Sequence, residues 1–174
     1  MAPEIVMPRD AELSDAIRAT LSQLPPLNVF RMMAAVPASF QPFVDIARSV
    51  LVGGSFDPHL RELAILRVGA VTRASYEWRQ HAAFAPKVGV TPDELAAVSA
   101  IGTVSDLTAD QNLVCRVADE ISFQVRLSNE ALQALIDRFG NAGAAELILC
   151  VSYFNMLSRF LESTRVPFEK KAGA

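Results

Sequence analysis

DPHLRELAILRVGAVTRASYEWRQHAAFAPKVGVT, residues 57–91, is the most informative stretch of the chain, because its pattern indicates two helices in succession. Asp57 and Pro58 are typical of a helix start, since aspartate caps free backbone N–H groups and proline suits the first helical position. The residues that follow, as far as Ala70, are apolar on nearly every face, which predicts a buried helix. Residues 72–75 interrupt this pattern, and a second helix is expected to begin near their end.

Glu62, Glu77 and His81 are the candidate catalytic residues of this stretch. A carboxylate in an apolar helix is costly unless it is paired or protonated. Glu62 is therefore interpreted either as the partner of an arginine or as a functional carboxylate, held in a cleft with a raised pKa. Glu77 and His81 are four residues apart and share one helix face. This spacing lets the glutamate orient the imidazole or relay a proton, and a solvated helical pair is the alternative.

The same stretch resembles the core motif of the carboxymuconolactone decarboxylase family, which includes the alkyl-hydroperoxidase D-like proteins. The segments that carry the resemblance are RELAILRVG at residues 61–69, YEWRQH at residues 76–81 and APKVGVTPDEL at residues 85–95. A broader likeness extends over residues 28–168. The resemblance implies an all-α bundle of the alkyl-hydroperoxidase D-like type, which in this family assembles into trimers and hexamers.

The resemblance also implies which branch of the family is closer. The peroxidase branch has a glutamate, a cysteine twelve residues later, a second cysteine three residues after that, and a histidine four further on. Counted from Glu62, these places fall on Ala74, Glu77 and His81. Both cysteines are absent, and a CxxC pair is what reduces peroxide, through an activated thiolate and a resolving thiol. The decarboxylase branch also lacks the CxxC pair and keeps the histidine, so it is the closer match.

Six further residues are predicted to contact a substrate. Arginine can hold a carboxylate through paired hydrogen bonds, and two aromatic side chains flank Glu77 in the sequence. The segments at residues 28–43 and 153–169 resemble parts of the family fold that lie over or approach the pocket. The predicted contacts are Arg61, Arg73, Tyr76, Trp78, Phe30 and Asn155. Plain core packing is the alternative for Phe30.

The remaining pattern predicts helices throughout. No segment shows sustained alternation of apolar and polar residues, and no Asn-Gly hairpin signal is present. The fold class is therefore all-α, and the chain of 174 residues is expected to form one domain, residues 1–174, with its core motif at residues 57–95. Helices are expected at residues 12–24, 29–36, 38–52, 58–70, from 74 or 75 onward, 92–100, 109–126, 129–140 and 142–164.

Composition limits the partners and the location. The net charge of −3 gives no basic footprint for nucleic acid. A hydrophobic content of 51% and a mean hydropathy of +0.27 suggest large buried subunit interfaces, so we expect a homo-oligomer, a dimer, trimer or hexamer. The N-terminus lacks the features of a signal peptide, and the most apolar run, residues 144–157, is too short to span a bilayer. We therefore expect a cytoplasmic protein with no membrane partner.

No cofactor is predicted, because the sequence contains no GxxxxGK[ST], GxGxxG, HExxH or GxSxG motif. Cys115 and Cys150 lie 35 residues apart, without metal-ligand spacing, and are expected to be buried thiols, with a redox role as the alternative. No metal site is predicted either. Glu62, Glu77 and His81 could supply three ligands if they converge, but one histidine and two carboxylates make a weak divalent site.

Three functions are compatible with these residues. The first is an enzyme that carries out a decarboxylation or a related lyase step on a small carboxylated or lactone-type substrate, with His81 shuttling the proton. The second is a thiol peroxidase of the alkyl-hydroperoxidase type, which would need an exposed, acidic thiol at Cys115 or Cys150. The third is a non-catalytic small-molecule binder. The first is the predicted function.

Overall fold

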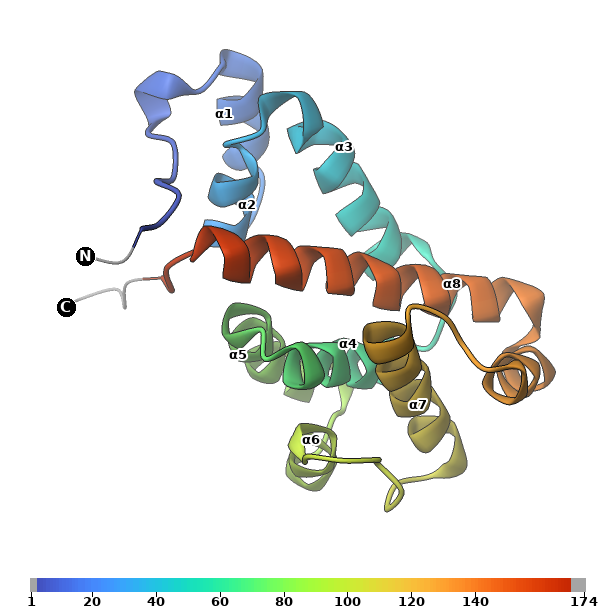
Figure 1. The fold of residues 1–174 in the computed structure, drawn as a ribbon. Helices are drawn as coiled ribbons and strands as arrows, with labels where there is room; N and C mark the ends of the chain where they lie inside the picture. The colour runs from blue at the N-terminus through green and yellow to red at the C-terminus, as the bar shows by residue number, and fades with distance from the viewer. Residues whose placement is uncertain (1–2, 170–174) are drawn as a thin grey trace. The chain divides into compact units, whose positions relative to one another are not determined.

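The structure, a computed structural model, describes residues 3–169, and every regular element in that range is helical, so the all-α prediction is confirmed there (Figure 1). The described residues form eight α-helices, with a short 3₁₀ turn before the first of them at Asp10–Glu12 and π-helical or 3₁₀ turns between later ones at Ser49–Gly53 and Ala85–Val88. The α-helices are α1 (Asp15–Leu21), α2 (Asn28–Met33), α3 (Pro37–Arg48), α4 (Pro58–Thr72), α5 (Ser75–Phe84), α6 (Pro92–Ser99), α7 (Ala109–Gln124) and α8 (Asn129–Thr164).

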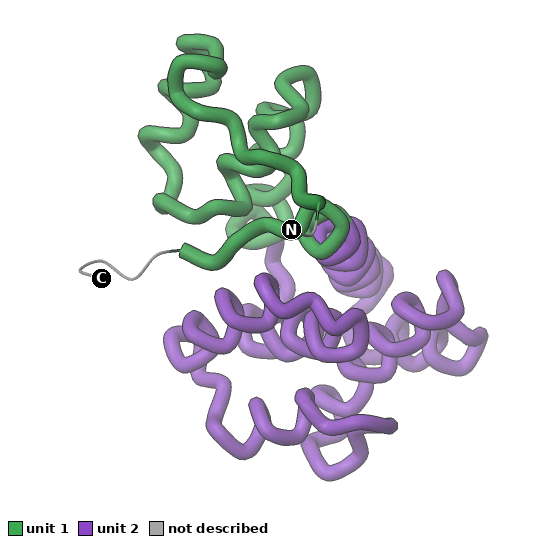
Figure 2. Tube along the Cα trace, turned by 60° about the vertical axis from the view of Figure 1, so that its left-hand side comes forward, with its two compact units in different colours: residues 1–53, 160–174 green, residues 54–159 purple. Residues whose placement is uncertain are grey.

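The described chain divides into two compact units (Figure 2). The first contains residues 3–53 and 160–169, and the second contains residues 54–159. All three candidate catalytic residues belong to the second unit. The expectation that residues 1–174 form a single domain stays a prediction.

In the first unit, α1 and α2 pack against α3 around a small apolar core of Met32, Phe40 and Val44. The expected helix at residues 12–24 is shorter in the structure, because Ser14 accepts a hydrogen bond from the Ile17 N–H and so caps α1 at Asp15. The residues before this cap form only a 3₁₀ turn.

In the second unit, α4 is the central helix. Residues 62–69 are buried, and α5, α6 and α7 all pack against α4. Asp57 accepts a hydrogen bond from the Leu60 N–H at 2.9 Å, and Pro58 is the first helical residue, as predicted. An all-round apolar helix is stable only in such an enclosed position. It therefore carries Glu62 into the protein interior.

A tight turn at Arg73 reverses the chain between α4 and α5. Arg73 adopts the left-handed conformation (φ 56°, ψ 34°), and the Ala74 N–H donates to the Gly69 carbonyl at 2.9 Å. This is the Schellman arrangement, which satisfies the last carbonyls of α4. A Cβ at Gly69 would lie 3.4 Å from the Trp78 backbone nitrogen, so the glycine lets the two helices approach closely. Their side chains can therefore meet across the turn.

The two predicted capping boxes, at the starts of α6 and α7, are both present. Thr91 accepts from the Glu94 N–H, and the Glu94 carboxylate accepts from the Thr91 N–H at 2.7 Å. The same carboxylate also lies 3.1 Å from His59 Nε2 and accepts from Gln111. Glu94 thereby links α4, α6 and α7, and these bonds hold its pKa below the usual value although partial burial opposes this.

Arg67 connects α4 to α7 and to the end of α6. Its guanidinium makes two hydrogen bonds to the Asp119 carboxylate of α7, at 2.6 and 3.0 Å. It also donates to the carbonyls of Val98, Ala100 and Gly102, which lie at the end of α6 and in the loop that follows. A buried guanidinium is tolerated only when its donors are satisfied in this way. Arg67 is therefore a structural residue of the second unit.

α8 consists of two helical segments that meet at Gly140, whose backbone (φ 69°, ψ 172°) is not helical. This agrees with the predicted break between residues 140 and 142. The second segment carries Glu146, which accepts from the backbone N–H groups of Ser55 and Phe56, both at 2.8 Å. A Cβ at Gly54 would lie 2.5 Å from the Glu146 carboxylate, so the glycine is required for this contact.

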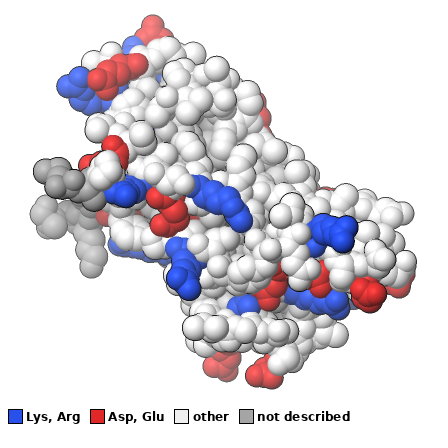
Figure 3. Space-filling view, in the orientation of Figure 1, with Lys and Arg blue, Asp and Glu red and all other residues white. Residues whose placement is uncertain are grey.

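By length and composition alone, α8 would be able to cross a membrane, but 56% of its apolar window is buried inside the fold. The core helix of a soluble protein has the same character. On the face shown in Figure 3, acidic and basic side chains are interspersed among large uncharged areas.

Candidate active site

His81 and Glu62 form a short hydrogen bond between α5 and α4. His81 Nδ1 lies 2.7 Å from Glu62 Oε1. An ionised carboxylate can only accept a hydrogen bond, so Nδ1 carries a proton and Nε2 is left for other contacts. The partner that the structure gives Glu62 within the described residues is His81 rather than an arginine.

Glu77 approaches the opposite side of the imidazole. Its Oε2 atom lies 3.6 Å from His81 Nε2, which is too long for a hydrogen bond. The two residues do share one face of α5, as their spacing predicts. The side chains of Glu62, Glu77 and His81 are only 3%, 5% and 15% exposed. The structure therefore brings all three candidate catalytic residues together, with the imidazole between two buried carboxylates.

Burial and charge change the proton affinities of this group. Burial raises the pKa of Glu77, and the Glu62 charge raises it further, although the charge of His81 acts in the opposite direction. Burial by itself would lower the pKa of His81, but the hydrogen bond and charge of Glu62, together with the charge of Glu77, raise it overall. Groups with shifted pKa values that share a buried site are suited to proton transfer.

α8 supplies aromatic residues beside His81, as the resemblance of residues 153–169 implies, but Phe154 itself was not identified from the sequence. The Phe154 ring meets the His81 ring edge-on, with centroids 5.0 Å apart and planes at 89°. Tyr153 makes a similar edge contact with Phe154 at 5.2 Å, and both side chains are buried. Burial raises the pKa of Tyr153, and the nearby Glu77 adds to this effect. The available signal was helical spacing, because residue 154 lies one turn after the buried Cys150 and so shares its face.

Asn155, the neighbour of Phe154, has other partners. Its amide donates to Ser122 Oγ on α7 at 2.9 Å and to the Val151 carbonyl at 3.0 Å, and its oxygen accepts from Arg159 at 2.6 Å. Among the described residues, no hydrogen bond or ion pair joins Asn155 to His81. The amide ties α8 to α7, and its predicted contact with a substrate stays a prediction.

The predicted arginines lie at the two ends of α4. Arg61 donates to the Phe56 carbonyl at 3.2 Å, near the start of the helix. Arg73 is exposed in the left-handed turn at the other end. Within the part of the chain that the structure describes, no arginine makes a hydrogen bond or ion pair with Glu62 or His81. The cationic partner that the described residues provide for Glu62 and for Glu77 is the His81 imidazole.

The remaining predicted contacts are aromatic. Tyr76 is buried at the start of α5, and Trp78 is half-buried with its backbone against Gly69. Phe30 is half-buried on α2, in the first unit. The roles of these three residues in substrate binding stay predictions.

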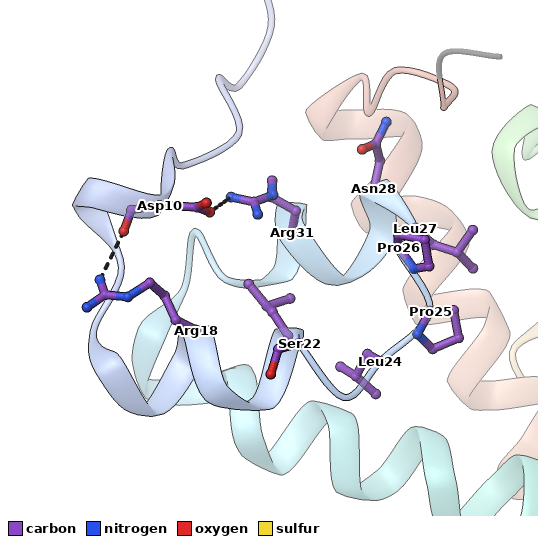
Figure 4. Close-up of a pocket in the computed structure, with 10 residues that line it drawn as sticks. Asp10, Arg18, Ser22, Leu24, Pro25, Pro26, Leu27, Asn28 and Arg31 are labelled. Atoms are coloured by element: carbon purple, nitrogen blue, oxygen red, sulfur yellow. Dashed lines mark hydrogen bonds and ion pairs between the residues drawn. The ribbon is translucent and has the colours of Figure 1, made fainter. Parts of the chain in front are cut away.

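The first unit contains a separate cavity of about 490 Å³ between the end of α1 and the start of α2 (Figure 4). Arg31 makes an ion pair with Asp10 at 2.7 Å, and Arg18 donates to the Asp10 carbonyl and pairs with Asp15. Both guanidinium groups of the lining are thus occupied by neighbouring aspartates. None of the residues predicted from the sequence to act on a substrate lines this cavity.

The two thiols are unsuited to peroxide chemistry. Burial raises the pKa of Cys115 and of Cys150 to about 12 in each case, so both are protonated near neutral pH. Peroxide reduction requires a thiolate. Within residues 3–169, no group of three or more His, Cys, Asp or Glu side chains is arranged to hold a metal ion.

Known proteins share the motif and the fold. The sequence model of the carboxymuconolactone decarboxylase family matches residues 37–120. An uncharacterized peroxidase-related protein from Ralstonia eutropha JMP134, solved as an alkylhydroperoxidase AhpD core, is similar with a TM-score of 0.83 and 18% identity, over 98% of this chain and 95% of that one. An uncharacterized peroxidase-related protein from Silicibacter sp. TM1040 is similar with a TM-score of 0.80 and 16% identity, over 98% of this chain and 94% of that one. A comparison with curated proteins found no significant match. The predicted alkyl-hydroperoxidase D-like fold is confirmed.

Proposed function

We propose that the chain is an acid–base enzyme acting on a small carboxylated or lactone-type substrate, since its residues 37–120 match the sequence model of the carboxymuconolactone decarboxylase family. The observation that carries the proposal is the orientation of His81. Glu62 binds Nδ1 at 2.7 Å, so Nε2 is the nitrogen that can exchange a proton with a ligand. A base oriented by a hydrogen-bonded carboxylate is the general requirement for this kind of catalysis.

The reaction that fits best is the decarboxylation of an acid in which the carbon that bears the carboxylate is bonded to a carbonyl carbon. The bond between the carboxylate and the adjacent carbon breaks, and CO₂ leaves. The electron pair of that bond passes onto the carbonyl oxygen as an enolate, which a protonated imidazole stabilises. The carbon then takes up one proton, which His81 relays from solvent. The raised pKa of His81 supports its presence as the imidazolium.

The test is turnover of a panel of small carboxylated lactones, followed by CO₂ release. His81→Ala should lower the rate about a hundredfold or more, since general acid–base catalysis contributes at least that much. His59→Ala is the matched control, because His59 contacts Glu94 rather than the Glu62–His81 pair and its loss should leave turnover nearly unchanged. Circular dichroism must show that both variants are folded. Unchanged turnover in folded His81→Ala would sink the proposal.

A thiol peroxidase is the second candidate, because the similar solved structures are named peroxidase-related. Ala74 and Glu77 stand where the peroxidase branch has its cysteines, and the two thiols present are buried with raised pKa values. We therefore expect no peroxide consumption with a dithiol reductant, in the wild type or in the Cys115→Ala/Cys150→Ala variant. Activity in the wild type that the double variant loses would favour the peroxidase instead.

A further inference from the structure

Glu77 is a buried carboxyl group that forms an ion pair with His81 but makes no hydrogen bond within the described residues. Its Oε2 atom lies 3.6 Å from His81 Nε2, and its side chain is only 5% exposed. The Glu62 carboxyl group, by contrast, accepts from His81 Nδ1 at 2.7 Å. Buried polar groups are normally hydrogen-bonded, and an exception calls for a functional or ligand-based explanation.

A single ligand oxygen can hydrogen-bond to Glu77 and His81 at the same time. Hydrogen bonds between such groups are about 2.8 Å long, and an oxygen placed beside the 3.6 Å line can lie at that distance from both atoms. Phe154 packs against the imidazole and keeps its orientation, so Nε2 stays directed toward Glu77. Glu77 Oε2 and His81 Nε2 are therefore close enough together for one ligand oxygen to bond to both.

The number of protons that Glu62, Glu77 and His81 carry sets the net charge of the site, and this charge determines whether it favours a neutral or a negatively charged ligand oxygen. Two ionised carboxylates with one imidazolium would leave a net negative charge in a buried site that has no arginine or lysine partner within the described chain, and such a charge is costly. A state with ionised Glu62, protonated His81 and neutral Glu77 carries no net charge. The raised pKa values of Glu77 and His81 agree with this state.

We propose that Glu77 works as a neutral carboxylic acid, and that its O–H and the His81 Nε2–H together bind the carbonyl oxygen of the substrate as it becomes an enolate oxygen. This inference rests on the proposed function and assigns the substrate class: a compound whose carbonyl oxygen takes up negative charge. Two buried donors aimed at a developing oxyanion stabilise it more than the reactant carbonyl. The leaving carboxylate lies away from Glu77.

The protonation of Glu77 can be measured directly. Infrared difference spectra between the wild type and Glu77→Gln at neutral pH should show the carbonyl stretch of a neutral carboxylic acid, lost in the variant. Glu94→Gln is the matched control, because hydrogen bonds lower the pKa of Glu94 and its removal should affect only carboxylate bands. Absence of an acid band in the Glu77→Gln difference spectrum would overturn the inference.

Binding of 4-nitrophenol, whose ionised form is yellow, tests the donor pair. The wild type should bind it as the phenolate. Glu77→Leu should weaken binding about ten- to a hundredfold, since a hydrogen bond to a charged group is lost. Glu77→Gln should stay within a few-fold of wild type, because its amide still donates. Equal weakening in both variants, binding of the neutral phenol, or no binding by the wild type would contradict the inference.

Neither measurement depends on turnover. Failure of the carboxylated lactones to react would overturn the proposed function alone, whereas a missing acid band would overturn only the role of Glu77. If Glu77→Leu does not fold, the infrared measurement on the wild type and Glu77→Gln still decides the question.

Discussion

Glu62 Oε1 accepts a hydrogen bond from His81 Nδ1 at 2.7 Å, across the turn that joins α4 to α5. The residue that orients the imidazole is therefore on the neighbouring helix, rather than four residues earlier on the same helix. This arrangement separates the two carboxylates by role, because Glu62 holds the ring and Glu77 faces the nitrogen that remains available.

Removing the charge of Glu62 should change His81 most directly. Glu62→Gln keeps the shape of the side chain but removes the negative charge that helps to raise the pKa of His81. We expect a lower His81 pKa and a loss of turnover of about a hundredfold. Proton NMR titration can follow the chain's two histidines separately, with His59→Ala to assign the signals. A His81 pKa equal to that of the wild type would contradict the role of Glu62.

The raised pKa of Glu77 predicts a specific dependence of stability on pH. A carboxyl group whose pKa is raised by folding contributes stability that is fully present below its unfolded pKa, about 4.3, and that is lost as pH rises through the folded pKa. Glu77→Gln cannot ionise, so its free energy of unfolding relative to wild type should rise with pH over this window. Urea unfolding at several pH values measures this difference. A difference that stays constant with pH would argue against a raised pKa.

Phe154 should matter for both stability and the site. Phe154→Ala removes a buried ring that contacts His81, and we expect a loss of about 3–5 kcal/mol in the free energy of unfolding. Phe154→Leu should lose less, because it fills much of the space. Met156→Ala on the exposed side of the same helix is the control, and its effect should be within about 0.5 kcal/mol. Equal losses for Phe154→Ala and Met156→Ala would show that the ring is not part of the core.

Arg67 should be required for the fold but not for the chemistry. Arg67→Met removes the partner of Asp119 and leaves three carbonyls without their donor, so we expect a loss of about 3–5 kcal/mol. Arg116→Ala breaks a more exposed ion pair with Glu120 and should cost about 0–1 kcal/mol. Thermal unfolding compares the two variants. A similar shift of Tm in both would mean that the Arg67 network is weak.

The sequence predicted the elements that depend on local chemistry. The cap at Asp57, the boxes at Thr91 and Thr108, and the break at Gly140 all appear where the residue types indicate them. The first helix was predicted too long because Ser14, a stronger cap, lies inside the apolar pattern. Local signals of this kind act within a few residues and can be read from one sequence.

The partners within the site could be predicted only in part. Glu62, Glu77 and His81 were identified as residue types with the right spacing, but the pairing of Glu62 with His81 depends on how closely α4 and α5 approach, which Gly69 and the Arg73 turn set. Phe154 was missed because its contact with His81 depends on the docking of α8, more than seventy residues away in the chain. Such contacts are tertiary and leave only a weak periodic signal.

The turn at Arg73 has a consequence for how this site can vary. Successive residues of an α-helix are rotated by about 100° around its axis, since one turn takes 3.6 residues. One residue inserted into or deleted from this turn, with the start of α5 displaced accordingly, would swing His81 about a quarter of the way round the helix and away from Glu62. The hydrogen bond between Glu62 and His81 therefore requires one particular register of α5 relative to α4, and the number of residues in a single reverse turn determines that register.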